Sequence, residues 1–136
     1  MNWRERHELR KAHCGIKDLW KKIFSWISQK KFAIDIINIC KVIKEERGEK
    51  ILVGQLLRSA TSIGANLHEG NYASSKADFI NKLQIALKEC YETDYWLELF
   101  KETGYITAEE YKRMHESCSK IRTILTASIK TAKKNV

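Results

Sequence analysis

Apolar residues recur at alternating steps of three and four along most of the chain, which is the spacing of an amphipathic α-helix. Proline, which breaks helices, is absent, and glycine occurs at only 6 positions. The pattern is interrupted at Gly48, at GNYASS (70–75) and at TGYIT (103–107). These breaks predict four helices, over about residues 32–46, 51–69, 76–103 and 108–132. Because the connections are short, we expect an all-α, up-down-up-down antiparallel four-helix bundle over residues 30–134.

The third and fourth predicted helices carry the clearest local signals. Ser75 with Asp78 and Thr107 with Glu110 match the capping pattern S/T-x-x-D/E, which places helix N-termini at those points. Each helix then shows one continuous seam of apolar or small residues, of the kind that antiparallel helices bury against one another. The seams are Phe79, Leu83, Ala86, Cys90, Thr93, Leu97 and Phe100 in the third helix, and Tyr111, Met114, Cys118, Ile121, Leu125, Ser128 and Ala132 in the fourth.

Residues 1–29 precede the bundle as a basic amphipathic extension. The segment GIKDLWKKIFSWISQK (15–30) has an apolar stripe at helical spacing with lysines outside it, which predicts an additional N-terminal helical segment. The stripe is Ile16, Leu19, Trp20, Ile23 and Ile27. A basic amphipathic helix can lie on a membrane surface. Packing on its own bundle or on a sister subunit is favoured instead, because the bundle already offers an apolar surface.

The second predicted helix is unusual because Arg58 is its one formally charged residue between Ile51 and His68. A helix without a charged half is normally enclosed by protein. One stripe, suited to the core of the subunit, is Val53, Leu56, Ala60, Ile63 and Leu67. A second stripe, displaced by about 100°, is Gln55, Ser59, Ser62, Asn66 and Glu69. It is either a plain solvated face or a homo-oligomer interface; the missing Lys and Glu favour the interface, and Ala60 and Gly64 would let another helix approach closely.

A lone arginine on such a helix needs a carboxylate partner. Antiparallel pairing about a turn near residue 72 brings Arg58 within one turn of Glu89 and Glu92. We therefore expect a buried structural ion pair between Arg58 and one of these glutamates, within the chain or across the interface.

Composition and cysteine spacing favour a single-domain protein with reduced thiols. A chain of 136 residues with 43% hydrophobic content can form one domain that needs neither metal nor disulfide. The four cysteines lie at least 26 residues apart without metal-binding spacing, so reduced, packed thiols are expected. The charged N-terminus has no signal-peptide pattern and no apolar run approaches the ~18 residues of a membrane span, so we expect a cytoplasmic protein without a membrane partner.

The sequence gives no sign of a catalytic centre, a metal site or a cofactor. Di-metal bundles need matched Glu-x-x-His motifs from two helices, and none of the four histidines supplies one. Gly-rich phosphate loops and a recognisable nucleophile–base arrangement are absent from the sequence as well. We therefore expect a non-enzymatic protein.

The net charge of +8 is concentrated at the two ends of the chain. Residues 1–31 hold nine Lys or Arg against three Asp or Glu, and residues 120–136 hold five against none. In an up-down-up-down bundle both segments meet at the end that carries the 70–75 turn, which predicts sequence-independent contact with the phosphates of RNA or DNA. The residues expected to make it are Arg10, Lys11, Lys17, Lys21, Lys22, Lys130, Lys133 and Lys134, with Lys120 and Arg122 nearby. Basic tails that merely solubilise the protein are the plainer interpretation.

An alternative function is a protein-interaction scaffold that binds a partner protein without contacting nucleic acid. Its anchors would be Tyr91, Tyr95, Trp96, Phe100 and Tyr105. Tyr and Trp are enriched in such anchors, although on a helix they are more often core. No interleaving of aromatic and basic residues of the single-strand-binding type is visible, so aromatic residues are expected to matter less for nucleic-acid binding.

The stretches QLLRSATSIGANLHEG, SSKADFINKLQIALKECYETDYWLELF and TGYIT resemble the bacterial four-helix-bundle family of 23S rRNA intervening-sequence proteins. The resemblance covers about residues 30–134, and the family's Asn-Ile-x-Glu-Ala/Gly segment stands here as Asn66 to Gly70. It implies a bundle that assembles into a ring, with a pentamer expected, and no catalytic activity. A related branch, the accessory protein of diversity-generating retroelements, binds a reverse transcriptase and nucleic acid, so the resemblance also implies a tie to RNA or DNA and to such a partner protein.

Overall fold

The computed structural model describes residues 28–134 of the chain, and the four predicted bundle helices are all present there. They are α3 (Ser28–Arg47), α4 (Ile51–Gly70), α5 (Lys76–Glu102) and α6 (Ala108–Lys134). This part of the chain contains no strand, so the predicted all-α fold is confirmed. None of its helices is long and apolar enough to cross a membrane. The additional N-terminal helical segment predicted upstream of Ser28 lies outside the described residues.

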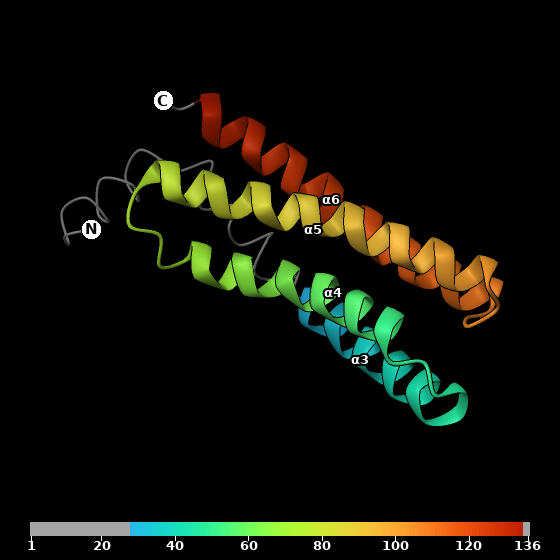
Figure 1. Ribbon diagram of the computed structural model, residues 1–136. Helices are drawn as coiled ribbons and strands as arrows, with labels where there is room; N and C mark the ends of the chain where they lie inside the picture. The colour runs from blue at the N-terminus through green and yellow to red at the C-terminus, as the bar shows by residue number, and fades with distance from the viewer. Residues whose placement is uncertain (1–27, 135–136) are drawn as a thin grey trace.

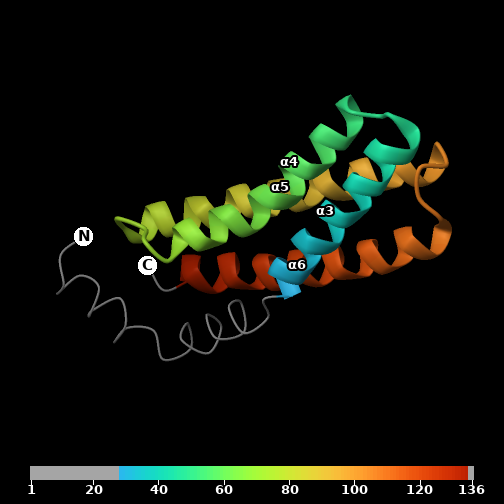
Figure 2. The same ribbon diagram turned by 90° about the horizontal axis from the view of Figure 1, so that it is seen from below.

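The four helices form an antiparallel bundle in which each helix packs against the next one along the chain, and α3 also packs against α6 (Figure 1). With 20 residues, α3 is shorter than α5 and α6, which have 27 each. It crosses the bundle obliquely and begins beside the middle of α6 (Figure 2). The first helix therefore runs in the predicted direction, but the expectation that it starts at the end carrying the α4–α5 turn is wrong for the described helix.

The helix ends follow the predicted signals. Gly48 ends α3 with a φ of 70°, a left-handed conformation that glycine adopts without steric penalty. Ser75 caps α5 by accepting a hydrogen bond on its Oγ from the Asp78 backbone N–H at 3.0 Å. At α6 the capping box is complete, because the Glu110 N–H donates to Thr107 Oγ1 at 3.1 Å and the Thr107 N–H donates to Glu110 Oε1 at 3.0 Å. These local bonds fix where each helix begins.

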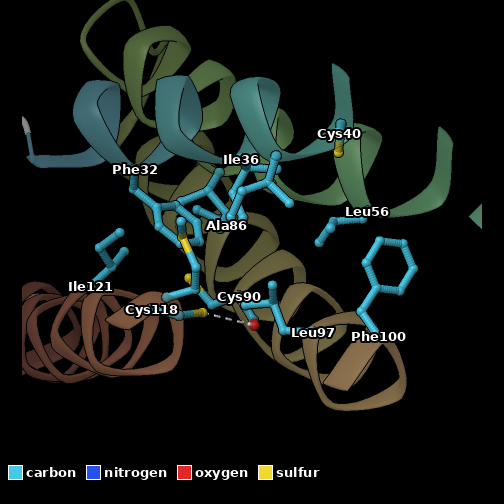
Figure 3. Close-up of a cluster of buried hydrophobic side chains, with 14 of the residues drawn as sticks. Phe32, Ile36, Cys40, Leu56, Ala86, Cys90, Leu97, Phe100, Cys118 and Ile121 are labelled. Atoms are coloured by element: carbon cyan, nitrogen blue, oxygen red, sulfur yellow. Dashed lines mark hydrogen bonds between the residues drawn. The ribbon is translucent and has the colours of Figure 1, made fainter. Parts of the chain in front are cut away.

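The core lies between the helices and is built from the predicted seams. Every seam residue of α5 and α6 is buried except Phe79 and Tyr111, which are half-buried near opposite ends of the bundle. Phe32 and Ile36 of α3 point toward Ala86 of α5, so α3 covers the side of the core that the other three helices leave open (Figure 3). Full burial of a side chain of this size contributes roughly 1.5–3 kcal/mol, so the short α3 is an integral part of the bundle.

Three of the four cysteines belong to this core. Cys40, Cys90 and Cys118 are buried free thiols, and the Cys118 thiol donates to the Cys90 carbonyl oxygen at 3.3 Å (Figure 3). Burial raises the pKa of Cys40 to about 11. A hydrogen bond with Cys118 and burial together raise the pKa of Cys90. Both thiols are therefore protonated and inert at neutral pH, as expected of packed cysteines; Cys14 lies outside the described residues.

Candidate functional site

The basic cluster at the end of α6 consists of Lys130, Lys133 and Lys134, called the lysine cluster below. All three residues are exposed. Among residues 28–134, none of the ion pairs involves them. Lysines in the last turns also offset the partial negative charge of a helix C-terminus. The other residues expected to contact phosphate lie outside the described part of the chain: Arg10, Lys11, Lys17, Lys21 and Lys22.

The α4–α5 turn lies at the same end of the bundle as the lysine cluster (Figure 1). The register of α5 against α6 leads to the same placement, because His115 contacts Asp94 at 2.6 Å. Lys133 follows His115 by as many residues as Lys76 precedes Asp94. The first turn of α5 and the last turn of α6 are therefore level with each other, and the residues of the α4–α5 turn lie just beyond them.

Two carboxylates lie near this turn, and each is bonded to a group of α5 or of the turn itself. Glu69 Oε2 accepts a hydrogen bond from Lys82 Nζ at 2.8 Å. Asp78 Oδ2 accepts one from the Ser74 N–H at 3.0 Å. Neither carboxylate forms an ion pair with the lysine cluster, so within residues 28–134 the three lysines leave the α6 side of this end positively charged.

Tyr72 is an exposed aromatic residue at this end that the periodic pattern of the sequence does not predict. The residue is 77% exposed, and its ring packs on the imidazole of His68 with centroids 5.6 Å apart and planes inclined by 56°. The sequence does contain a signal for this ring: a tyrosine stands within GNYASS, a segment of turn-forming Gly, Asn and Ser residues, which places it at the surface.

Arg122 does not belong to the lysine cluster, which corrects the expectation that the basic C-terminal segment gathers at one place. Its Nη1 lies 3.6 Å from Asp94 Oδ2, and its guanidinium carbon lies 5.2 Å from the centre of the Tyr91 ring. Lys130 follows eight residues later, or about 12 Å along the helix. Arg122 therefore takes part in the contact between α5 and α6.

The same contact contains a polar seam that the sequence did not predict. The Tyr111 ring stacks on the His115 imidazole at 5.3 Å, with 17° between the planes, and Lys101 Nζ lies 4.2 Å from the centre of the Tyr111 ring. Burial raises the pKa of Tyr111, and the nearby Asp94 carboxylate raises it further. The seam holds two helices together; within residues 28–134, no group of three or more His, Cys, Asp and Glu side chains is placed to hold a metal ion.

The predicted ion pair of Arg58 is confirmed in its partners but not in its burial. The Arg58 guanidinium donates to Glu92, and its Nη1 lies 3.4 Å from Glu89 Oε2. The hydrogen bond to Glu92 raises the pKa of Arg58, whereas burial raises the pKa of Glu89 against the opposing effect of the arginine. The exposed fractions of the side chains are 49% for Arg58, 20% for Glu89 and 36% for Glu92. The expectation of a buried pair is therefore wrong for the subunit.

Ser59 does not lie on the outward face of α4, which corrects its assignment to an oligomer interface. The residue is 0% exposed. Its Oγ accepts a hydrogen bond from Thr93 Oγ1 at 3.0 Å and donates to the Leu56 carbonyl at 3.1 Å. Ser59 is buried because α5 packs against this side of α4, so that the polar partner expected from a facing helix is supplied within the subunit.

The other members of the predicted stripe remain on the outside of α4. Gln55 and Glu69 are exposed, and Ser62 and Asn66 are half-exposed. Asn66 Nδ2 donates to the Ser62 carbonyl of its own helix at 2.8 Å. A side chain at Gly64 would meet nothing within 4 Å, so no helix of the described residues approaches it closely. The result is an open polar face on which Glu69 is the one charged member of the predicted stripe.

The aromatic residues proposed as anchors divide into surface and core. Tyr91 and Tyr95 are 56% and 54% exposed. Phe100 is fully buried and packs against the half-buried Tyr105, with ring centroids 5.7 Å apart. Trp96 is half-buried, and its indole N–H has no hydrogen-bond partner within residues 28–134. Phe100 is therefore wrong as an anchor for a partner protein, and the two exposed tyrosines of α5 remain available.

Comparison with known proteins places the chain in a family. The family model of the 23S rRNA-intervening sequence protein matches residues 21–127, and thus ends just before the lysine cluster. A crystal structure of a protein of unknown function from the S23 ribosomal protein family of Bacteroides thetaiotaomicron is 48% identical, covers 75% of this chain and 94% of that chain, and superposes with a TM-score of 0.73. No curated protein matches. The chain belongs to the family of 23S rRNA-intervening sequence proteins.

Proposed function

We propose that this chain is a non-enzymatic, ring-forming accessory protein that binds nucleic acid through the end of the bundle carrying the lysine cluster. The observation that supports binding is the set of three exposed lysines on one helix end, which form no ion pair among the described residues. Such a cluster contacts phosphates without reading bases, so binding is expected to be tolerant of sequence and steeply dependent on salt.

A ring would multiply this surface. In a closed ring with cyclic symmetry every subunit presents the same end to the same side, so several lysine clusters would face one nucleic acid. Linked sites of this kind bind more tightly than one site alone by factors of roughly 10² or more. A pentamer, as the family resemblance implies, is the ring we propose.

The outward face of α4 is the proposed contact between subunits, through Gln55, Ser62, Asn66 and Glu69. Two of these side chains already have partners within the subunit, because Asn66 Nδ2 donates to the Ser62 carbonyl at 2.8 Å and Glu69 Oε2 accepts from Lys82 Nζ at 2.8 Å. The Gln55 amide and the Ser62 hydroxyl would find theirs across the interface. Size-exclusion chromatography with light scattering tests this directly. Ser62→Lys would bury an unpaired charge and is expected to shift the protein toward monomer.

The matched control for Ser62→Lys is Ser117→Lys on α6. Both serines are half-exposed and lie within long helices of the bundle, so the two variants place the same new charge on two different faces. The control is expected to keep the wild-type mass. A wild-type protein that is monomeric at micromolar concentration, or equal masses for the two variants, would refute the proposed interface.

Nucleic-acid binding is tested by filter binding over a range of salt concentrations. Neutralising the lysine cluster with Lys130→Gln, Lys133→Gln and Lys134→Gln together is expected to weaken binding of every RNA and DNA and to flatten the salt dependence. The control changes three exposed lysines near the opposite end of the bundle in the same way: Lys41, Lys44 and Lys50. Equal effects of the two triple variants would show a general charge effect and would contradict a localised site.

A scaffold that binds a partner protein, such as a reverse transcriptase, is the second candidate function. The exposed rings of Tyr91 and Tyr95 on the outside of α5 favour it, because aromatic side chains are common anchors at protein interfaces. The two candidates separate in the filter-binding experiment. No retention of RNA or DNA at low salt would contradict the first function and leave the scaffold as the better proposal.

A further inference from the structure

The α4–α5 turn presents an aromatic ring to solvent at the end of the bundle that carries the lysine cluster (Figure 1). Tyr72 has the highest exposed fraction, 77%, among the aromatic residues within 28–134. Tyr91 and Tyr95, the next in order, lie on the side of the bundle and are 56% and 54% exposed. The face of an exposed aromatic ring is apolar and polarisable, and it is suited to stacking against another flat group.

Hydrogen bonds fix the backbone of the turn from which this ring projects. The Tyr72 N–H donates to the Glu69 carbonyl at 2.9 Å, and the Ala73 N–H donates to the Gly70 carbonyl at 3.3 Å. The ring itself rests against the imidazole of His68, which α4 fixes. A ring that is already positioned loses little conformational freedom when a ligand stacks on its open surface.

Charge at this end favours a ligand that carries phosphates as well as a flat group. The lysine cluster lies on the α6 side of the turn, whereas the carboxylates of Glu69 and Asp78 lie on the α4 and α5 side and are bonded there. A polyanion running along the lysine cluster avoids both carboxylates. A nucleotide strand bound there would share this end of the bundle with the Tyr72 ring.

We infer that Tyr72 is a stacking site for an unpaired nucleobase, so that the nucleic acid bound at this end is single-stranded or looped. The inference rests on the nucleic-acid binding proposed above and specifies the class of ligand. Interior bases of a duplex are covered on both faces by their neighbours, whereas an unpaired base can splay out and stack on an aromatic side chain. Such stacking tolerates any base, because every base has a π-face.

The test is fluorescence anisotropy with the full-length protein and labelled oligonucleotides of about 16 nucleotides. Three probes are compared, each as RNA and as DNA: an unstructured single strand, the same strand with abasic sites, and a blunt duplex. Loss of a stacking aromatic weakens binding roughly 5- to 150-fold per base. Tyr72→Ala is therefore expected to weaken binding of the single strand by this factor and to leave the duplex and the abasic strand unchanged, whereas Tyr72→Phe keeps wild-type affinity.

Tyr91→Ala is the matched control, since it removes an exposed ring midway along the bundle, beside Arg122. It should leave all three probes unchanged. If the wild type binds the probes and Tyr72→Ala changes none of them, or weakens single strand and duplex alike, the stacking site is refuted while phosphate binding stands. If the wild type binds no probe at low salt, the proposed function is refuted and the stacking site with it.

Discussion

Removal of Arg58 tests whether its ion pair with Glu89 and Glu92 is a screened surface pair, as the structure shows, or a buried pair, as the sequence predicted. Arg58→Ala deletes the only positive charge that faces Glu89 and Glu92 among the ion pairs of residues 28–134. The variant leaves two carboxylates, one helical turn apart on α5, without their counter-charge. Like charges at this spacing on one helix repel each other.

The expected loss of stability follows from the exposure of the three side chains. A buried pair that loses one partner costs about 3–5 kcal/mol, but the Arg58 side chain is 49% exposed and Glu92 is 36% exposed. Exposed pairs contribute about 0.2–1 kcal/mol each because water screens them. With two such contacts, we expect Arg58→Ala to lower the free energy of unfolding by about 1 kcal/mol. For a chain of 136 residues this corresponds to roughly 3–5 °C in Tm.

The loss is expected to depend on pH, and its sign follows from Glu89. Burial raises the pKa of Glu89 above its ordinary value of 4.5, and the charge of Arg58 holds this rise in check. In the variant the folded-state pKa rises further, so the folded state binds more protons than the unfolded state. Stability then falls as pH rises from 4.5 through the folded-state pKa. The gap between variant and wild type is therefore largest at neutral pH and closes in acid.

Urea unfolding of both proteins at neutral pH and in acid measures this gap. Lys82→Ala is the matched control, because it breaks one exposed pair with Glu69, and it should cost less than Arg58→Ala. Arg58→Lys keeps the charge and should recover part of the loss. A loss of about 3 kcal/mol or more, or a loss that is the same at both pH values, would refute the assignment of Arg58 to a screened surface pair.

Four further predictions concern the core and the helix ends. Thr93→Val removes the hydroxyl that donates to buried Ser59 and should cost about 1–2 kcal/mol in urea unfolding. Gly48→Ala should destabilise by about 1 kcal/mol, because φ is 70° there. Gly54→Ala should stabilise by roughly 0.5–1 kcal/mol, because a helical side chain there meets nothing within 4 Å. In a Cys14→Ser variant the three buried thiols should react with a thiol reagent only as the protein unfolds; rapid labelling of the native state would contradict their burial.

The helices were predictable because their signals are local. The turn glycine Gly48 and the capping residues Ser75 and Thr107 act through backbone groups within a few residues, so their spacing in the sequence is sufficient. The oblique path of α3 was not predictable, because a crossing angle depends on how side-chain ridges of two helices fit together. Its start at Ser28, beside the middle of α6, is a consequence of that packing (Figure 2).

The partners of Arg58 were predictable from antiparallel register alone, but exposure was not. Register fixes the level of a residue along a bundle, whereas exposure depends on which side the next helix covers. For the same reason Ser59 was assigned to the wrong face: a stripe on α4 can be drawn from the sequence, but only the position of α5 shows that Thr93 faces it. Tyr72 was missed because turns are expected to be polar, and aromatic residues in them have no periodic signal.

If several lysine clusters on one ring contact the same nucleic acid, affinity depends on assembly. A monomeric variant that keeps its lysine cluster measures this dependence. Ser62 lies at mid-helix on α4, remote from the lysine cluster at the end of α6, so Ser62→Lys leaves every proposed phosphate contact intact. If affinity arises from several clusters on one ring, the monomeric variant should bind the same nucleic acid roughly 100-fold more weakly, and with a smaller salt slope because fewer phosphates are contacted. Equal affinity and slope for ring and monomer would mean that a single subunit forms the whole site, and the ring would then need another explanation.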